Sequence, residues 1–214
     1  MKTSEIYSKY MIPTILRNHM YRVTAIARIL VESLKSEVAL DIDLVTKAML
    51  LHDMGNIIKS PAANDVLYTE EEIKELRKVE ELIKRYGNNE HTVTMTIARE
   101  LHVPEKVLYI LEHIGSSRLH LTVDLDDWYI KLCSYSDFRV APTGVVSVEE
   151  RFDEVVRRYA GSQHALADVE KTEKKKQLAL VLEKQIQKVC NISLDKIDIE
   201  KVEKIAKELE DYYV

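Results

Sequence analysis

Apolar residues recur at intervals of three and four positions along most of this chain, which is the spacing of one face of an α-helix. One early segment shows the pattern clearly, with Ile15, His19, Val23, Ile26 and Leu30 on a single face. The chain contains only five glycines and four prolines, which leaves few positions for β-turns. The pattern therefore predicts an all-α fold, a compact multi-helix bundle with a C-terminal helical extension.

Capping residues, prolines and glycines indicate where these helices begin and end. Capping boxes are expected at Thr69 and Ser147, and Gly55 is expected to end the helix that carries the run Ala48–Asp53. The expected helices cover roughly residues 4–11, 13–35, 44–54, 69–86, 90–101, 104–114, 126–141, 147–160 and 162–190, with a last one from about 198.

One domain boundary is expected near Gly161-Ser162. Residues 1–161 would form a compact helical domain, and residues 162–214 a helical hairpin packed on it. Apolar stripes and alternating charge on the C-terminal helices are also compatible with a homodimer.

Composition narrows the classes of partner. The formal net charge is −5 and no long basic stripe is present, so a nucleic acid polymer is not an expected partner. No apolar run approaches the roughly 20 residues needed to span a membrane, and no apolar stretch follows the first residues. The two cysteines do not form a disulfide framework. A cytoplasmic protein without a membrane partner is therefore expected.

Six titratable side chains occupy otherwise apolar helical faces or helix ends. They are His19, His52, Asp53, His91, His113 and Asp137. Any one such histidine is usually a core residue satisfied by one or two hydrogen bonds. Six of them pointing inward from five helices are costly to bury unless they are paired or bind an ion. Imidazole and carboxylate ligands suit Mn, Fe, Co, Ni or Zn, with Mg as a further candidate.

His52 and Asp53 are neighbours, so their side chains diverge by about 100° on a regular helix. Both reach one ion only if it lies near the end of the helix, close to the axis. The sequence therefore predicts a metal site at this helix end, with the other ligands supplied from distant parts of the chain.

The order His19, His52-Asp53, Asp137 resembles the HD-domain superfamily of metal-dependent phosphohydrolases. The segments around these residues, His19–Val23, Leu50–Gly55 and Tyr135–Arg139, are similar to its ligand segments. The resemblance covers roughly residues 14–160. It implies that these four side chains bind one ion. Family members with two ions use further histidines, and His91 and His113 match those positions in order.

Departures from the family pattern bear on the substrate. The family often has a lysine where this chain has Asn56, which leaves Lys59 as the nearest substitute. The Gly-Tyr-Pro segment of cyclic-di-GMP phosphodiesterases is absent from the sequence. So are the double-histidine flank of the deoxynucleotide triphosphohydrolases and the Glu-Asp pair of the guanosine-polyphosphate hydrolases. These substrates are disfavoured.

The expected activity is hydrolysis of a phosphate ester, in a nucleotide or another small phosphorylated molecule, by a metal-activated water. Asp53 would orient or deprotonate that water. Lys59 and Arg118 are the expected contacts to the phosphoryl oxygens, with Arg22 and Arg139 as further candidates.

Two alternatives remain. The same six ligands would support a di-iron oxygenase of the HD type. A helical regulatory module that senses a metal or a nucleotide is the other.

Overall fold

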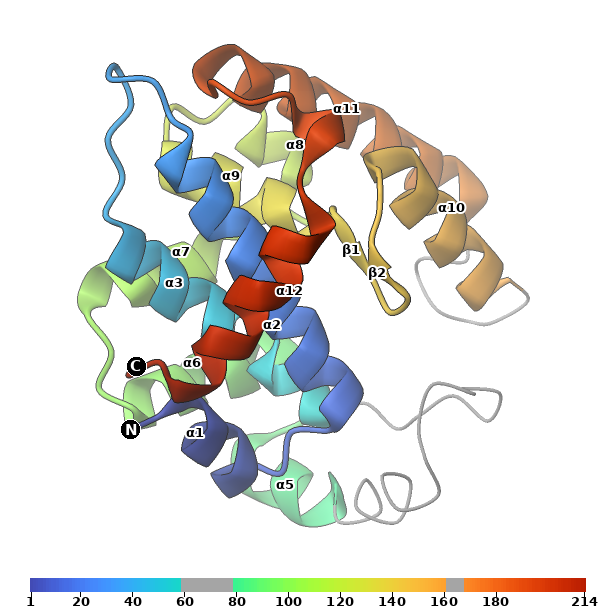
Figure 1. Ribbon diagram of the computed structural model, residues 1–214. Helices are drawn as coiled ribbons and strands as arrows, with labels where there is room; N and C mark the ends of the chain where they lie inside the picture. The colour runs from blue at the N-terminus through green and yellow to red at the C-terminus, as the bar shows by residue number, and fades with distance from the viewer. Residues whose placement is uncertain (59–78, 161–167) are drawn as a thin grey trace.

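The computed structural model describes residues 1–58, 79–160 and 168–214, with only the backbone described for 79–81. It confirms the all-α fold class, with one small β-hairpin added (Figure 1). The α-helices are α1 (Thr3–Lys9), α2 (Thr14–Glu32), α3 (Ile42–Leu51), α5 (Val79–Tyr86), α6 (Glu90–Glu100), α7 (Glu105–His113), α8 (Leu119–Thr122), α9 (Trp128–Asp137), α10 (Val148–Tyr159), α11 (Val169–Val189) and α12 (Ile199–Glu208). The short 3₁₀ helices are η1 (Met54–Ile58), η3 (Leu194–Lys196) and η4 (Leu209–Asp211).

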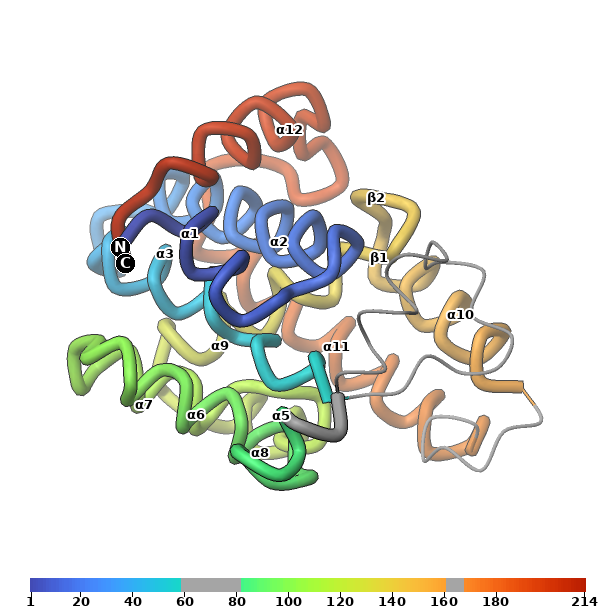
Figure 2. The backbone as a smooth tube through the Cα atoms, turned by 90° about the horizontal axis from the view of Figure 1, so that it is seen from below, coloured from blue at the N-terminus to red at the C-terminus, as the bar shows by residue number. Residues whose placement is uncertain are grey.

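Helix α2 is the centre of the molecule. It packs against α3 and α9 on one side and α12 on another, and Figure 2 shows α12 lying along it. Its residues Val23, Ile26 and Leu30 are fully buried, as the sequence pattern predicts. Two ligand-bearing helices, α3 and α9, are thus held against the helix that carries His19.

Capping side chains fix the starts of several helices. The Ser147 hydroxyl accepts from Glu150 N and the Glu150 carboxylate accepts from Ser147 N, so the predicted capping box is confirmed. Asp41 and Asp198 cap α3 and α12 with their carboxylates. The capping box predicted at Thr69 lies outside the described residues.

Gly55 does not end α3, so that prediction is wrong. The α-helix ends at Leu51, and Gly55 lies in η1. Its N–H donates to Thr94 Oγ1 at 2.8 Å. A Cβ at this position would lie 1.8 Å from the carbonyl oxygen of Glu90. A glycine is needed because η1 and α6 approach this closely.

Helix α9 ends earlier than its sequence predicts. It stops at Asp137, and a two-stranded antiparallel hairpin follows, β1 (Val140–Ala141) paired with β2 (Gly144–Val145). Gly144 has φ +133°, a conformation that suits glycine.

The C-terminal helices pack on the rest of the molecule. Helix α11 contacts α8, α9 and α10, while α12 lies on α2. Residues at the two ends of the chain pair with each other, with Thr3 N donating to Tyr212 O at 2.8 Å. The boundary predicted near residues 161 and 162 falls outside the described residues and stays a prediction. None of the helices in the described segments combines the length and apolar character that crossing a membrane requires.

Candidate metal centre

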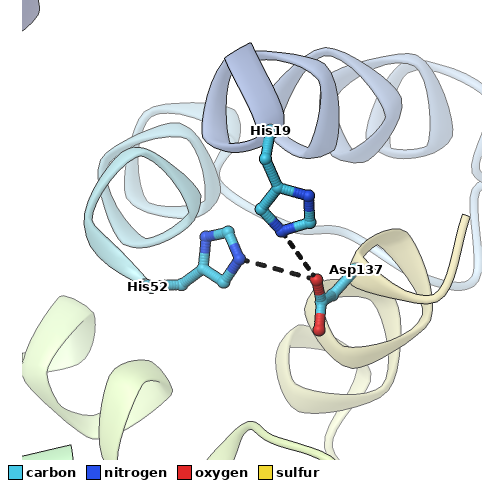
Figure 3. Close-up of side chains that lie close together, drawn as sticks. All are labelled: His19, His52 and Asp137. Atoms are coloured by element: carbon cyan, nitrogen blue, oxygen red, sulfur yellow. Dashed lines mark ion pairs between the residues drawn. The ribbon is translucent and has the colours of Figure 1, made fainter. Parts of the chain in front are cut away.

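Three ligand atoms from three helices meet at one point (Figure 3). His19 comes from α2, His52 directly follows α3, and Asp137 is the last residue of α9. His19 Nε2 lies 3.1 Å from Asp137 Oδ1, and His52 Nε2 lies 3.7 Å from the same oxygen. All three ligand atoms lie within 4.8 Å of one another. The fold thus brings together side chains that are 33 and 85 positions apart in the sequence.

Asp53 lies at the edge of this group. Its Oδ2 is 3.6 Å from His19 Nε2 and 3.8 Å from His52 Nε2. The regular helix has ended at Leu51, so His52 and Asp53 both project from the helix end. This arrangement matches the geometry expected for adjacent residues that serve one site.

The donor set fits a divalent cation. Ligand atoms bound at about 2.0–2.2 Å to one tetrahedral or octahedral ion lie roughly 3.0–3.5 Å apart. The separations of 3.1–3.8 Å between the imidazole and carboxylate atoms are close to that range.

His52 provides a second indication of fit. Its Nδ1 lies 2.7 Å from Met49 O, and a carbonyl only accepts, so Nδ1 carries a proton. The side chain is 5% exposed, and within the described part of the chain its Nε2 finds no hydrogen-bond partner. A buried polar atom without a partner needs an explanation. A bound cation supplies one, with the Met49 carbonyl orienting the ring.

Charges around the group favour a cation there. Burial alone would lower the pKa of His52, but the negative charges of Asp53 and Asp137 and the hydrogen bond from Nδ1 to Met49 O raise it to about 9. Burial alone would raise the pKa of Asp137, but the neighbouring His19 and His52 rings hold it well below its usual range. The Asp137 carboxylate therefore stays ionised and attracts positive charge.

His91 and His113 are not part of this group. His91 Nε2 lies 3.1 Å from Glu112 Oε2, and the His91 side chain is 42% exposed. His113 Nδ1 donates to Tyr109 O at 2.8 Å, and its ring lies against the Tyr109 ring. Over residues 1–58, 79–160 and 168–214, the one group of three close ligand atoms is His19, His52 and Asp137. A second ion at His91 and His113 stays a prediction.

The predicted phosphate contacts have separate outcomes. Lys59 lies outside the described residues. Arg118 Nη2 lies 3.6 Å from Glu112 Oε1, so it shares that carboxylate with His91. Its place next to His113 is the one sign of this bridging carboxylate in the sequence.

The two further candidate cations contact other groups of the protein. Arg22 makes two contacts to the Glu203 carboxylate on α12, at 2.6 and 3.3 Å. Arg139 is 5% exposed and donates to backbone carbonyls and to Tyr135. None of these contacts joins either guanidinium to His19, His52 or Asp137.

The model of the HD domain family matches residues 16–123, just over half of the chain. The match includes His19, His52 and Asp53, whereas Asp137 lies beyond its end. No curated protein and no solved structure matches the chain.

Proposed function

This chain belongs to the HD domain family, and on that premise we propose that it hydrolyses phosphate esters of small molecules, such as a nucleotide or a phosphorylated metabolite. One observation carries the proposal: His19, His52 and Asp137 converge within 4.8 Å, beside Asp53, at the position of the family's signature.

The two histidines and Asp137 would hold a divalent cation, with Asp53 as a fourth ligand or as a neighbour of one. The donor set of imidazole nitrogen and carboxylate oxygen suits Mn, Fe, Co, Ni or Zn. A cation bound there lowers the pKa of a water and polarises a phosphoryl oxygen.

Asp53 has the geometry for a second role. Its side chain is 30% exposed, and one oxygen faces both histidines. We expect the other oxygen to accept a hydrogen bond from the attacking water and to take its proton.

Cationic groups would bind the phosphoryl oxygens. Arg118 is half-exposed and its guanidinium is shared with Glu112, so an incoming phosphate would compete with that carboxylate. Lys59 is the other candidate, by its place three residues after Asn56.

The test is a panel of phosphate monoesters and diesters, including nucleotides, with protein reconstituted with Mn²⁺, Co²⁺, Ni²⁺ or Mg²⁺. We expect turnover of at least one class, and a loss of about 100-fold or more in kcat/KM for His52→Ala and Asp53→Ala. His102→Asn is the matched control. His102 is an exposed histidine with φ +55° whose Nδ1 donates to Glu100 O, and asparagine tolerates that conformation.

Absence of all turnover with every metal would contradict the proposal. Iron at two per chain without phosphatase activity would favour an oxygenase instead. Tight nucleotide binding that survives Asp53→Ala, with no turnover, would favour a sensor.

A further inference from the structure

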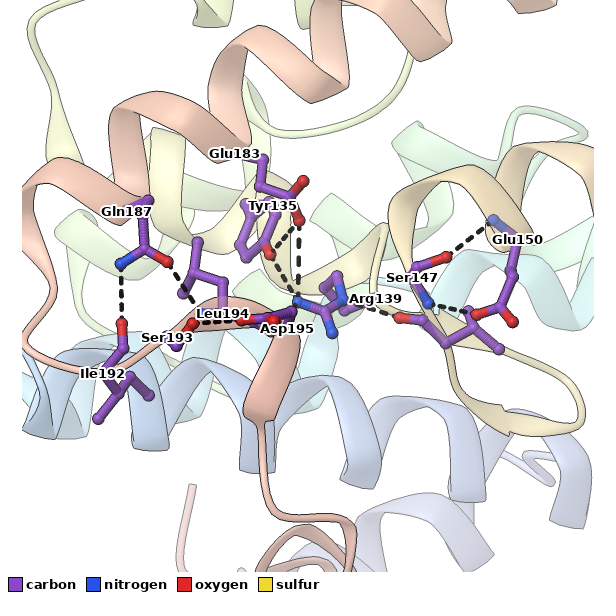
Figure 4. A network of polar contacts seen from close by, with 11 residues as sticks. Tyr135, Arg139, Ser147, Glu150, Glu183, Gln187, Ile192, Ser193, Leu194 and Asp195 are labelled. Carbon is purple, nitrogen blue, oxygen red and sulfur yellow. Dashed lines mark hydrogen bonds and ion pairs between the residues drawn. The ribbon is translucent and has the colours of Figure 1, made fainter.

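Arg139 joins the end of the ligand helix α9 to the C-terminal part of the chain (Figure 4). Its Nη1 donates to Leu194 O at 2.7 Å and to the Tyr135 hydroxyl at 2.6 Å. Its Nε donates to Val146 O at 2.7 Å, just beyond β2. One buried guanidinium thus contacts α9, the hairpin segment and η3.

Tyr135 extends the connection to α11. Its hydroxyl accepts from Arg139 and donates to Glu183 Oε1 at 2.7 Å. Tyr135 is fully buried. The Glu183 carboxylate also lies 3.9 Å from Arg139 Nη1, so its charge compensates that of the guanidinium. All three groups are therefore paired, which is what a buried charged network requires.

The place of Asp137 within this network matters. It lies midway between Tyr135 and Arg139, and residues two apart on a helix point about 200° away from each other. Tyr135 therefore anchors one side of the last turn of α9 while Asp137 faces His19 and His52 on the other. Arg139 N also donates to Ser136 O at 3.2 Å, which continues the helical turn past Asp137.

The turn that bears Asp137 leads directly into the β-hairpin. Asp137 is the final residue of α9, and the chain then enters a hairpin of two-residue strands. Such a short hairpin is marginal by itself. The three bonds of the Arg139 side chain hold both the hairpin end and the helix end in place.

We infer that Arg139 is a positioning residue for the metal centre: it fixes the last turn of α9 against α11 and η3, and so directs Asp137 toward His19 and His52. The inference rests on the proposed metal site. It assigns to residues 183–194, which lie beyond the family match, a part in metal binding. It also replaces the expectation that Arg139 contacts phosphate.

Co²⁺ titration, followed by the visible absorption of the bound ion, tests this in the full-length protein. We expect Tyr135→Phe and Arg139→Met to bind Co²⁺ about 10- to 100-fold more weakly than wild type, as changes behind a metal ligand do. The visible spectrum should change as well, because Asp137 shifts. Arg139→Lys keeps the charge without the planar fork, so we expect an intermediate affinity.

Arg151→Met is the matched control. Arg151 is a partly buried arginine that pairs with Glu154 at 2.7 Å. Both residues lie on α10, so this ion pair does not connect to α2, α3 or α9. Its Co²⁺ affinity and spectrum should equal those of wild type, whatever happens to its melting temperature.

The inference is overturned if Tyr135→Phe binds Co²⁺ with wild-type affinity and spectrum, even when its thermal stability falls. If Arg139→Met fails to fold, the Co²⁺ affinity and spectrum of Tyr135→Phe are the test of the inference. Wild-type protein that binds Co²⁺ but hydrolyses no ester would contradict the proposed function and leave this comparison valid. Wild-type protein that binds no Co²⁺ would overturn both.

Discussion

At Gly55 a methyl group would occupy space that the carbonyl group of Glu90 already fills. An ideal Cβ there lies 1.8 Å from the oxygen and 2.7 Å from the carbon of that group. Both atoms belong to the backbone, so neither can move away as the end of a flexible side chain would. The contact lies directly after His52 and Asp53, where η1 follows the candidate metal centre.

We predict that Gly55→Ala lowers the free energy of unfolding by about 3 kcal/mol, at the upper end of the effects of overpacking. Because η1 must move away from α6, Co²⁺ affinity should fall too. Urea unfolding and Co²⁺ titration measure the two effects.

Gly87→Ala is the control for this substitution. Gly87 has φ +91°, and among the residues that the structure describes no atom lies within 4 Å of an ideal Cβ there, so we expect alanine to meet backbone strain of about 1–2 kcal/mol. Co²⁺ affinity should not change. Equal metal affinities in the two variants and the wild type would contradict the role assigned to Gly55.

Individual residues of the site were predictable in part. The resemblance of the segments around His19, His52 and Asp137 identified three side chains that the structure brings together. The sequence could not show that His91 is exposed and pairs with Glu112, because a histidine at a helix start has no fixed direction until its neighbours are placed. Nor could the sequence show that the Arg139 side chain donates to the backbone carbonyls of Val146 and Leu194.

At the scale of the elements, the Glu100 carboxylate on α6 contacts side chains from α5 and from the end of α1. The hydroxyls of Tyr10 and Tyr86 donate to Glu100 Oε2 at 2.8 and 3.2 Å. Burial would raise the pKa of Glu100, but these hydrogen bonds and the charge of Arg85 lower it overall. The carboxylate thus links two flanking helices to the helix against which η1 packs.

Glu100→Gln should therefore destabilise the protein in a pH-dependent way. A pKa lowered by folding contributes stability that is present above the unfolded value and is lost as pH falls through the folded value. We expect a cost of about 1 kcal/mol at pH 7, the difference between a charged and a neutral acceptor, and a smaller cost at pH 3, below the ordinary pKa of a glutamate.

Urea unfolding at the two pH values measures this difference. Glu208→Gln, at an exposed position on α12, is the control. Its effect on the free energy of unfolding should be the same at both pH values. A cost for Glu100→Gln that is equal at both pH values would contradict the electrostatic explanation.

Helix boundaries were predictable where a side chain caps the first turn. Ser147 and Asp198 are examples. Their side-chain oxygens accept from backbone N–H groups two or three residues further along the chain, so the sequence alone indicates the cap. The end of α9 was not predictable. Its hairpin has strands of two residues, too short for an alternating pattern, and Arg139 holds it through contacts with distant parts of the chain.

At the scale of the whole molecule, the first and last residues lie side by side. Val214 N donates to Met1 O at 3.1 Å, and Lys2 pairs with Tyr213 in a β-bridge. Figure 1 shows both ends of the chain at one edge of the bundle. The chain thus closes on itself through backbone hydrogen bonds.

We predict that a circular permutant will fold, with residue 214 joined to residue 1 by a short Gly/Ser linker and new ends at Gly87 and Asn88. Both residues are exposed and lie between α5 and α6, where new ends are best tolerated. The expected results are a native helical circular dichroism spectrum and wild-type Co²⁺ affinity.

The control is the same permutant with residues 1–3 and 212–214 replaced by glycine and serine, which removes the pairing and should lower the melting temperature. If the permutant with intact ends is unfolded, the prediction is wrong, and folding requires the natural order of the helices as well as their contacts.

The covering of α2 by α12 has a consequence for biosynthesis. Helix α2 bears His19 near the beginning of the chain, but the helix that covers it comes from residues 199–208. Contacts this far apart in sequence form late, since a long loop must close first. During translation the face of α2 that α12 covers therefore stays uncovered until residues 199–208 have emerged from the ribosome. We expect the nascent chain to be a substrate for chaperones until residues 199–208 have been made.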